Sequence, residues 1–593
     1  MSYKVIFPFL VLMFAWSCAQ VGSPAGGPRD EDPPVVLESD PPNYSTRFNG
    51  NKFQVTFDEY IVLEDVNNEL VVSPPMKEKP EVKLKKKTLV IEIVDTLKQN
   101  TTYTFNFGSA IKDLHEGNPL LNYEYVFSTG DVLDSLSVKG TLKYAEDLSV
   151  PDEPISILLY SDLRDSVPML DIPLYVGRSN DSGVFSVNNL RPDEYKVIAL
   201  KDGNNNFLFD LPSEEIAFLD SSLIVNAEFA WQLLMEGGLI DTTPMVDTTG
   251  FEIDTIPYSG PDLNSVYVDL LLFVEESDIQ YITDYSREDP RRVELVFALP
   301  LTDSFQYRPL VPIGLDRSGL LEYYSTNRDS LTLWIRDSVY YKQDTLVIAI
   351  DYTVKDTTNQ FVTLVDTLQF TYREKTKKKS RGEPEKVKVE KLEVATIRNN
   401  GDLNLNGNLT VNLKLPFREM NDSLIRLFHI PDSVEVAVPF EVSLDTTLLT
   451  RGSIMADWEP ASQYRILFLP GAFASIYPPE HDTIDLNFNV RDIEFYGEII
   501  LNLERVDNRI IIQLMAENKV IRKRFVDQSG EYVFPYLIPG TYTMKFIHDL
   551  NENGKWDTGH YLKKIQPEPL ELLPLEITVR SNWEHDVTKK LEK

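Results

Sequence analysis

Hydrophobic and polar residues alternate along most of this chain with a period of two residues. The alternation is clear in the segments KFQVTFDEYIVL, TYTFNFG, TLVIAI, LTVNLKL and DLNFNV, which are rich in β-branched and aromatic side chains. Clusters of Asp, Asn, Gly and Pro separate such segments, as expected where one strand turns into the next. Stripes with the helical period are nearly absent. The pattern therefore predicts an all-β protein with several β-sandwich domains in tandem.

One stretch of the sequence occurs twice without a gap. Residues 182–210, SGVFSVNNLRPDEYKVIALKDGNNNFLFD, align with residues 529–557, SGEYVFPYLIPGTYTMKFIHDLNENGKWD, at a constant offset of 347 (529 − 182 = 347). Such a repeat predicts a duplicated β-unit, and each copy ends in a loop rich in Asp and Asn. Nine of the 29 aligned positions are identical: Ser182/Ser529, Gly183/Gly530, Leu190/Leu537, Pro192/Pro539, Tyr195/Tyr542, Asp202/Asp549, Asn204/Asn551, Asn206/Asn553 and Asp210/Asp557.

Two kinds of β-sandwich are suggested by family resemblance. Residues 34–130 contain TTYTFNFGSAIKDLHEGNPL and YEYVFSTG and resemble the SbsA-type bacterial Ig-like domain, which implies a sandwich that spaces or binds and does not catalyse. The repeated stretch has a Gly, an aromatic residue and then Leu-x-Pro-x-x-Tyr, ending at Pro192 and Tyr195 in the first copy. It resembles transthyretin-like or carboxypeptidase-regulatory-like sandwiches. That resemblance implies one such unit at residues 137–230 and a second at residues 495–580.

A weaker match concerns the second half of the chain. Tyr464 and Phe488 stand 24 residues apart, as do Tyr103 and Phe127 (488 − 464 = 24; 127 − 103 = 24). The spacing predicts either a divergent Ig-like sandwich at residues 387–490 or an unrelated sandwich. Composition predicts the remaining parts. These are a separate β-domain at residues 265–373, an acidic linker at residues 236–264 and a charged linker at residues 375–386.

The N-terminus predicts a lipoprotein signal peptide over residues 1–17. The apolar run from Val5 to Trp16 is too short to cross a bilayer as a stable helix. Ala15 and Ser17 lead to Cys18, the only cysteine in the sequence. The arrangement resembles a bacterial lipobox, in which that cysteine is acylated and becomes the mature N-terminus. The alternative is an ordinary signal peptide followed by an incidental cysteine. With a single cysteine, no intramolecular disulfide can form.

Residues 18–33 are rich in Gly and Pro and predict a flexible tether. The chain as a whole resembles Bacteroidetes-type outer-membrane lipoproteins, in which export to the cell surface is associated with acidic residues directly after the acylated cysteine. Here Asp30, Glu31 and Asp32 come too late for that signal. The resemblance therefore implies a protein anchored to the outer membrane by palmitate and other acyl chains, facing the periplasm.

The two repeated loops carry the candidate chemistry. Each places side-chain oxygens at positions 1, 3, 5 and 9, and Ca²⁺ takes about six to eight oxygen ligands. The loops resemble the first nine residues of EF-hand and dockerin-type calcium loops, but position 12 holds Ser213 or His560, so that Glu214, a carbonyl or water would have to complete the site. The alternative is a metal-free Asx-turn hairpin. The candidate ligands are Asp202, Asn204, Asn206, Asp210, Asp549, Asn551, Asn553 and Asp557.

The net charge and the absence of catalytic motifs reduce the number of functions that the sequence supports. A net charge of −34 argues against a nucleic-acid partner, whose phosphates would be repelled. The six histidines show no HExxH spacing, and no GxSxG, GxxxxGK[ST] or CxxC motif occurs in the sequence. The sequence favours a noncatalytic cell-envelope lipoprotein that serves as a spacer, scaffold or binding module for an envelope protein or glycan. The alternative is an envelope enzyme that acts on carbohydrate or peptide through a site without a recognisable motif.

Overall fold

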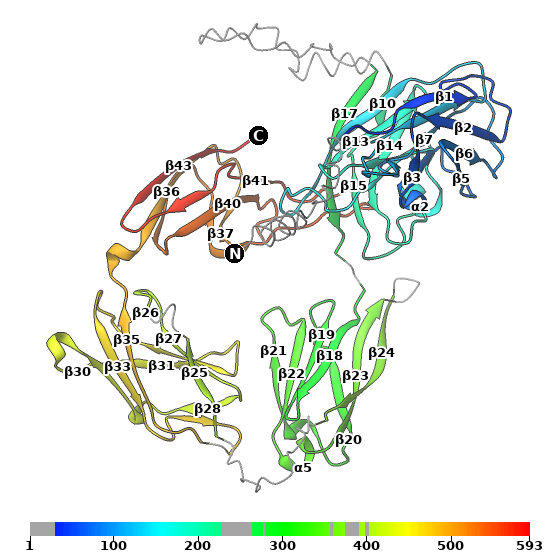
Figure 1. Cartoon of the computed structure of the whole chain (residues 1–593). Coiled ribbons are helices and arrows are strands. Elements are labelled where there is room, and N and C mark those ends of the chain that lie inside the picture. The colour runs from blue at the N-terminus through cyan, green and yellow to red at the C-terminus, as the bar shows by residue number, and fades with distance from the viewer. Residues whose placement is uncertain are drawn as a thin grey trace, which may run out of the picture. The chain divides into compact units, whose positions relative to one another are not determined.

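The computed structural model describes residues 30–226, 264–276, 279–355, 360–373, 391–397, 402–478 and 480–592. This part is built almost entirely of strands and loops, and the expected tandem of β-sandwiches is confirmed (Figure 1). The chain divides into two compact units, and each is described by itself. The first unit is Met1–Glu275 with Gly559–Pro567, and the second is Glu276–Thr558 with Glu568–Lys593.

The first unit begins with a sandwich of two sheets, ordered β1-β2-β6-β5 and β4-β7-β9, with β3 paired to β8. Its core is aromatic: Phe53, Phe105 and Phe127 are fully buried, and the ring of Phe53 stacks on that of Tyr125 at 3.9 Å between centroids. These residues occupy alternate positions of their strands and therefore share one face. The elements are β1 Val36–Asp40, β2 Lys52–Phe57, β3 Ile61–Leu63, α2 Val66–Glu69, β4 Val71–Ser73, β5 Glu81–Lys85, β6 Thr88–Glu92, β7 Thr102–Asn106, β8 Ile111–Asp113 and β9 Glu124–Ser128.

The second sandwich of this unit is a sheet that closes into a ring. Its order is β11-β12-β13-β10-β17-β15-β14, β14 also pairs with β11, and β16 is added to β14. The ring encloses a core that includes Leu142, Phe185 and Tyr195. The elements are β10 Leu136–Tyr144, β11 Ser156–Tyr160, α3 Val167–Leu170, β12 Tyr175–Ser179, β13 Val184–Leu190, β14 Asp193–Lys201, β15 Glu215–Phe218, β16 Leu223–Val225 and β17 Ser265–Val274.

Strand β17 belongs to this ring although it follows β16 by 40 residues (265 − 225 = 40). It runs parallel to β10, and Val268 lies opposite Gly140. A Cβ on Gly140 would stand 1.7 Å from the carbonyl oxygen of Val268, so only glycine permits this approach. The boundary expected at residue 265 thus falls at the last strand of the second sandwich. The sequence pattern predicts the start of a separate β-domain at these residues and names no partner for them.

The second unit begins with a sandwich whose sheets are ordered β18-β19-β22-β21 and β20-β23-β24. Its core includes Val293, Leu333, Ile348 and Phe370. The elements are β18 Ile282–Asp289, β19 Arg292–Phe297, β20 Gln306–Val311, η2 Arg317–Gly319, β21 Leu320–Tyr324, β22 Ser330–Ile335, α5 Ser338–Tyr341, β23 Thr345–Lys355 and β24 Phe361–Thr371.

The next sandwich has sheets ordered β25-β27-β32-β31 and β26-β35-β33-β29-β30, with β28 paired to β34. Its core includes Val411, Ile466 and Phe468. The elements are β25 Val394–Ile397, β26 Asp402–Leu403, β27 Leu409–Leu413, β28 Phe417–Met420, η3 Asp422–Leu424, β29 Ile425–His429, η4 Pro431–Ser433, β30 Val436–Ala437, β31 Glu441–Leu444, β32 Arg451–Met455, β33 Gln463–Phe468, β34 Phe473–Ser475 and β35 Ile484–Val490.

These two sandwiches repeat the strand order of the first sandwich of the chain. The sheet β1-β2-β6-β5 corresponds to β18-β19-β22-β21 and to β25-β27-β32-β31, and the pair β7-β9 corresponds to β23-β24 and to β33-β35. The residues noted for their 24-residue spacing are direct cross-strand partners, and a third pair has the same spacing (370 − 346 = 24). The partners are Tyr103 and Phe127, Leu346 and Phe370, and Tyr464 and Phe488. The three sandwiches thus share this spacing as well as their strand order, and a divergent Ig-like copy at residues 387–490 remains a prediction.

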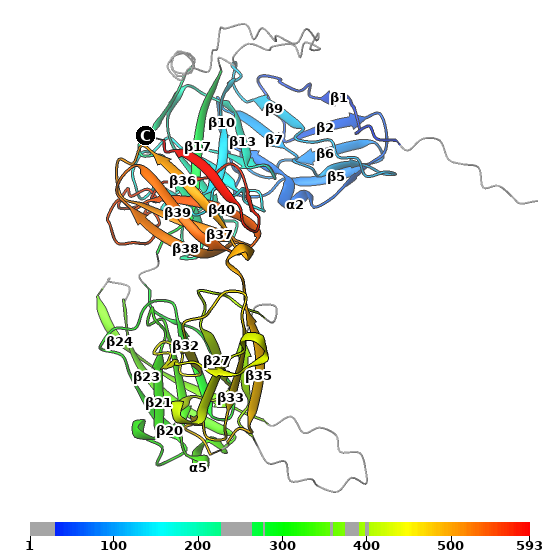
Figure 2. The same cartoon turned by 90° about the vertical axis from the view of Figure 1, so that its left-hand side faces the viewer.

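The last sandwich has the strand connections of the ring. Its sheets are ordered β39-β36-β43 and β38-β37-β40-β41, and β42 pairs with β40 (Figure 2). Strands β36 and β43 run parallel, as β10 and β17 do. The duplication therefore covers eight strands, more than the aligned stretch. The elements are η5 Ile493–Phe495, β36 Gly497–Glu504, β37 Ile510–Ala516, β38 Lys519–Val526, β39 Gly530–Leu537, β40 Gly540–His548, β41 Leu570–Leu572, β42 Ile577–Val579 and β43 Glu584–Lys590.

Candidate metal-binding loops

The repeated Asp- and Asn-rich loops follow equivalent strands. Strand β14 ends at Lys201 and β40 ends at His548, so the first aspartate of each loop comes directly after the strand. The first loop leads to β15 and the second to β41. Because the strand fixes the backbone up to the first aspartate, the loop must turn within a few residues. Asp and Asn side chains suit such turns, since they accept hydrogen bonds from nearby backbone N–H groups.

In the first loop the four predicted side chains come together. The side-chain amides of Asn204 and Asn206 donate to the two carboxylate oxygens of Asp210, over 3.1 and 2.9 Å. Asp202 Oδ1 accepts from the backbone N–H groups of Asn204 and Asn206, and its Oδ2 accepts from that of Phe207 at 2.7 Å. Both oxygens of Asp202 are therefore satisfied by the loop itself, as in an Asx-turn.

In the second loop the side chains also converge, with one difference. The side-chain amides of Asn551 and Asn553 both donate to Oδ2 of Asp557, over 2.6 and 2.5 Å. The side chain of Asp549 is fully buried, and its Oδ2 accepts from the backbone N–H of Gly554 at 3.1 Å. Its Oδ1 has no hydrogen-bond partner. A buried carboxylate oxygen without a donor costs free energy. Gly554 adopts φ 82°, the conformation expected for the sharp bend.

A buried glutamate closes the first loop. Glu214 is 2% exposed. Its Oε1 accepts from the backbone N–H of Gly203 at 3.2 Å, and its Oε2 accepts from those of Asp210 and Leu211, both at 3.0 Å. Glu214, which the sequence named as a candidate ligand, thus holds the two ends of the loop together.

Glu568 has the same role in the second loop, and sequence reasoning missed it. It is 6% exposed, its Oε1 accepts from the backbone N–H of Leu550 at 2.7 Å, and its Oε2 accepts from that of Asp557 at 3.1 Å. The offset between the copies changes from 347 to 354 after Asp557 (568 − 214 = 354), which corresponds to seven inserted residues (354 − 347 = 7). An alignment that allowed a gap after Asp557 would have found it.

The carboxylates of the second loop repel one another. Burial raises the pKa of Glu568, two backbone N–H groups oppose this, and the negative charges of Asp557 and Asp549 raise it further. Burial also raises the pKa of Asp557, but hydrogen bonds from Asn551, Asn553 and Lys555 outweigh burial and leave that pKa below its usual value. Three acidic groups therefore lie near one another, with Asp549 and Glu568 buried and Asp557 partly exposed.

Two cationic side chains already stand beside these acids. Lys555 Nζ lies 3.0 Å from Asp557 Oδ1, and Arg509 Nε lies 3.6 Å from Asp549 Oδ2. Across the described residues, no group of three or more His, Cys, Asp or Glu side chains is arranged to hold a metal ion. A cation in this loop would therefore need asparagine, backbone or water oxygens as well. Calcium binding by the two loops remains a prediction.

Other residues singled out by the sequence lie elsewhere. His548 does not turn into the adjacent loop: its Nδ1 lies 3.0 Å from Asn508 Oδ1, and its Nε2 lies 3.3 Å from Glu571 Oε1. His560 Nδ1 lies 3.4 Å from Glu275 Oε1 in the first unit. Cys18, the candidate lipidation residue, lies outside the described residues. Among the helices that the structure describes, none has the length and apolar character needed to cross a membrane.

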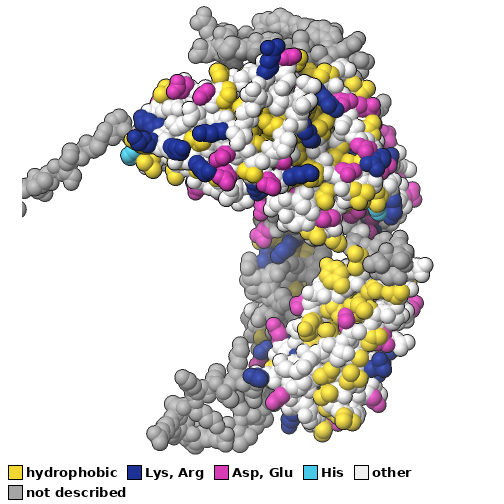
Figure 3. Space-filling view, turned by 90° about the vertical axis from the view of Figure 1, so that its right-hand side faces the viewer, with side chains coloured by type: hydrophobic (Ala, Val, Ile, Leu, Met, Phe, Trp, Pro, Cys, Tyr) yellow, Lys and Arg dark blue, Asp and Glu magenta, His cyan; other side chains and the backbone are white. Residues whose placement is uncertain are grey.

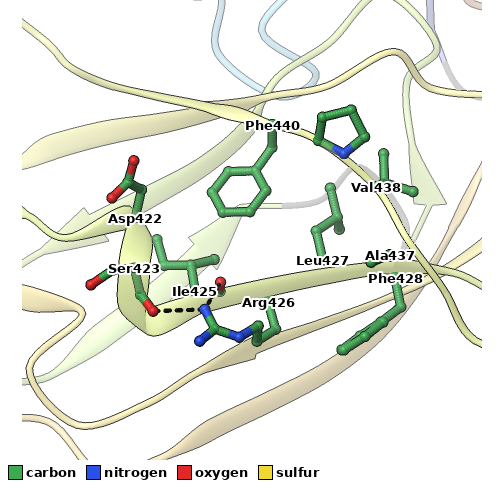
Figure 4. Close-up of a pocket in the computed structure, with 10 residues that line it drawn as sticks. Asp422, Ser423, Ile425, Arg426, Leu427, Phe428, Ala437, Val438 and Phe440 are labelled. Carbon is green, nitrogen blue, oxygen red and sulfur yellow. Dashed lines mark hydrogen bonds between the residues drawn. The ribbon is translucent and has the colours of Figure 1, made fainter.

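Two surface depressions have the size of a small-molecule site. One, of about 420 Å³, lies beside β29 and β30 (Figure 4). It is lined by Leu427, Phe440 and other mostly apolar side chains. Its one basic group, Arg426, donates through Nη1 to the carbonyl oxygens of Ser423 and Ile425, over 2.6 and 2.8 Å. That guanidinium nitrogen is already engaged by the backbone, and the lining offers no nucleophile paired with a base.

The other depression, also of about 420 Å³, lies in the third sandwich. It contains two arginines, both paired with acids: Arg317 Nη2 donates to Glu322 Oε2 at 2.8 Å, and Arg328 Nη1 lies 3.6 Å from Asp303 Oδ1. The positive charge that an anionic ligand would need is therefore largely neutralised.

Comparison with known families supports one of the sandwiches. Residues 30–129 match the family model of the bacterial Ig-like domain, in agreement with the Ig-like domain expected at residues 34–130. The protein is therefore a β-sandwich protein with an Ig-like domain near its N-terminus. No curated protein matches the chain.

Solved structures similar to this chain include an S-layer protein, SbsC, at 10% identity, covering 89% of this chain and 67% of that one, with a TM-score of 0.12. Alpha-2-macroglobulin from Escherichia coli, spanning domains MG0-NIE-MG1, is 12% identical over 50% of this chain and 97% of that one, with a TM-score of 0.18. The Corynebacterium diphtheriae major pilin SpaA is 11% identical over 77% and 100%, with a TM-score of 0.15. TM-scores this low carry no argument about function.

Proposed function

We propose that this chain is a noncatalytic lipoprotein of the outer membrane, anchored through acylated Cys18 and facing the periplasm, that serves as a spacer or scaffold for an envelope partner. One observation carries the proposal. The described residues form five hydrophobic cores, one for each sandwich, and the sandwiches have only two strand orders. Repeating a stable module extends the reach of a chain, and it requires no catalytic cleft.

Contacts between neighbouring sandwiches within a unit support a spacing role. In the first unit, the backbone N–H of Val176 donates to Ser73 Oγ at 3.1 Å. In the second unit, the buried Tyr477 hydroxyl donates to the carbonyl oxygen of Ile335 at 2.8 Å, and its ring packs against Trp334. Hydrogen bonds of this kind fix the angle between adjacent domains, because breaking them leaves buried polar groups unpaired. Sandwiches joined in this way can hold a partner at a defined position.

The surface also suits an envelope partner. On the face in Figure 3, acidic and basic side chains are interspersed, and hydrophobic side chains gather over the lower part of the view. A mixed surface with a net negative charge disfavours nucleic acid. We therefore propose an envelope protein or glycan as the partner.

The test compares the full-length chain with Cys18→Ser in cells. We expect the natural chain in the outer-membrane fraction, labelled by a palmitate analogue, and degraded by added protease only after the outer membrane is permeabilised. The variant should lose the label and leave the membrane. Crosslinking in native membranes, followed by purification through this chain, should then recover the same partner only when Cys18 is present. Membrane association without label, or equal recovery by the variant, would contradict the proposal.

A further inference from the structure

The two repeated loops form a natural comparison, because they share the same four side chains and differ in how those are satisfied. Both oxygens of Asp202 accept backbone hydrogen bonds. In Asp549, the side chain is fully buried and Oδ1 lacks a partner. The carboxylate lies inside its loop, since its other oxygen accepts from Gly554. A cation can satisfy a buried carboxylate oxygen that has no donor, whereas both oxygens of Asp202 already have backbone donors.

We infer that the loop Asp549–Asp557, closed by Glu568, is a Ca²⁺ site, and that the Asp202 loop is a hydrogen-bonded turn that binds Ca²⁺ far more weakly. The proposed donors are three carboxylates and two side-chain amides, which must draw together around the ion because no three acidic side chains of the described residues are already arranged to hold one. Ca²⁺ prefers such hard oxygen ligands, and water completes the required number. The donors are Asp549, Asn551, Asn553, Asp557 and Glu568.

The convergence of the amides fits this assignment. Asn551 and Asn553 direct their side chains at the same carboxylate oxygen, Oδ2 of Asp557. The side-chain oxygens of Asn551 and Asn553 already accept from the backbone N–H groups of Asn553 and Lys555, over 3.0 and 2.9 Å, and each amide oxygen has a second lone pair for a metal. Each oxygen of Glu568 accepts one backbone N–H, and a carboxylate oxygen has a further lone pair for a metal. A cation here would also relieve the repulsion among Asp549, Asp557 and Glu568.

Two cationic side chains beside the second loop should weaken its affinity for Ca²⁺. Lys555 contacts Asp557 and must be displaced or share that carboxylate with the ion. Arg509 stands beside Asp549 on the oxygen that already accepts from Gly554. The affinity should therefore be weak, with a Kd of about 10⁻⁴ to 10⁻³ M, the range of extracellular modules. Replacing Lys555 by Gln removes a competing cation and should tighten binding.

Trp556 provides a specific reporter. It lies within the second loop, and its Nε1 donates to the carbonyl oxygen of Glu568 at 2.9 Å. Tb³⁺ is a hard cation of similar chemistry, and an adjacent indole ring sensitises its luminescence. The first loop has Phe207 and Phe209 in the same region and no tryptophan. Luminescence excited through tryptophan therefore distinguishes the two loops.

The experiment titrates the full-length chain with Tb³⁺ and then displaces Tb³⁺ with Ca²⁺. We expect a saturable signal that millimolar Ca²⁺ removes and Mg²⁺ removes poorly, because Mg²⁺ demands stricter octahedral geometry. Asp549→Asn keeps the shape of the side chain and should weaken binding by at least about 10–100-fold, since even loss of an outer-shell partner has effects of that size. The matched control, Asp202→Asn, should leave the signal unchanged. Trp556→Phe should lose the signal and keep the heat of Ca²⁺ binding.

Three results would overturn the inference: no saturable signal or heat in the natural chain up to about 10 mM Ca²⁺, a signal that survives Asp549→Asn, or equal loss in Asp202→Asn. If Asp549→Asn fails to fold, Lys555→Gln decides, because tighter Ca²⁺ binding supports the site and unchanged binding refutes it. None of these outcomes depends on acylation of Cys18, so the metal site and the proposed function stand or fall separately.

Discussion

Gly140→Ala is expected to detach β17 from the ring of the second sandwich. An alanine Cβ at this position would lie 1.7 Å from the carbonyl oxygen of Val268 and 2.8 Å from Cζ of Phe185. Carbon atoms do not approach closer than 3.0 Å in such contacts, so the strands must separate by at least 1.3 Å (3.0 − 1.7 = 1.3). The carbonyl belongs to the backbone, and it cannot move without disturbing the hydrogen bonds beside it.

Two contributions determine how much the free energy of opening falls in Gly140→Ala. Overpacking in a well-packed core costs about 1–3 kcal/mol, and each lost ladder hydrogen bond costs about 1 kcal/mol. With about two ladder bonds lost, the free energy of opening should fall by roughly 3–5 kcal/mol. Amide hydrogens that exchange through this opening should then exchange about a hundredfold to a few thousandfold faster.

Hydrogen exchange followed by mass spectrometry measures these exchange rates peptide by peptide in the full-length chain. Peptides from β10 and β17 should lose protection together, whereas peptides from β36 and β43, the equivalent parallel pair of the last sandwich, should keep it. Gly530→Ala is the control, because a Cβ there meets no atom within 4 Å. If β17 peptides exchange at the natural rate in Gly140→Ala, β17 is not paired with β10 and does not belong to the second sandwich.

Two further predictions concern stability. The hydroxyls of Tyr464 and Tyr103 each accept a backbone N–H at 2.9 Å, from Glu459 and Lys98 respectively. Tyr464→Phe and Tyr103→Phe should each destabilise their own sandwich by about 1 kcal/mol. An unchanged melting temperature would contradict the equivalent role of the two hydroxyls. Burial raises the pKa of Asp113, but backbone N–H groups of residues 115–118 outweigh burial and lower the pKa from 3.8 to about 2. The stabilisation is therefore present above pH 3.8 and lost as the pH falls towards 2, so Asp113→Asn should lower the melting temperature at neutral pH and not at pH 2. An equal effect at both pH values would refute this reasoning.

The features that could be read from the sequence are those with a local signature. Alternating side chains such as those of β2 and β7 identify strands, because one face of each strand must be buried. The spacing of Tyr103 and Phe127 predicted a related pair at Tyr464 and Phe488, since a fixed hairpin length between two strands fixes the separation of cross-strand partners. Both observations depend only on residues close in sequence.

The structural features that the sequence analysis missed involve residues far apart in the chain, or positions where one copy of a repeat differs from another. Strand β17 pairs with β10, whose residues come 128 positions earlier (265 − 137 = 128), and no local pattern specifies that pairing. Leu346 replaces tyrosine in the third sandwich, so the spacing to Phe370 carried no aromatic signal. Glu568 was hidden by the insertion that follows Asp557. Recognition of the β17 pairing and of the third cross-strand pair required the three-dimensional arrangement, whereas an alignment with a gap after Asp557 would have found Glu568.

The most direct test of the proposed function is the mass of the mature N-terminal peptide, purified from the membranes of cells that express the natural chain. The account predicts that the mature chain begins at Cys18 and that this residue carries acyl chains, which anchor the tether at residues 18–33 to the membrane. A mature chain that begins at another residue, or an unmodified Cys18, would contradict it.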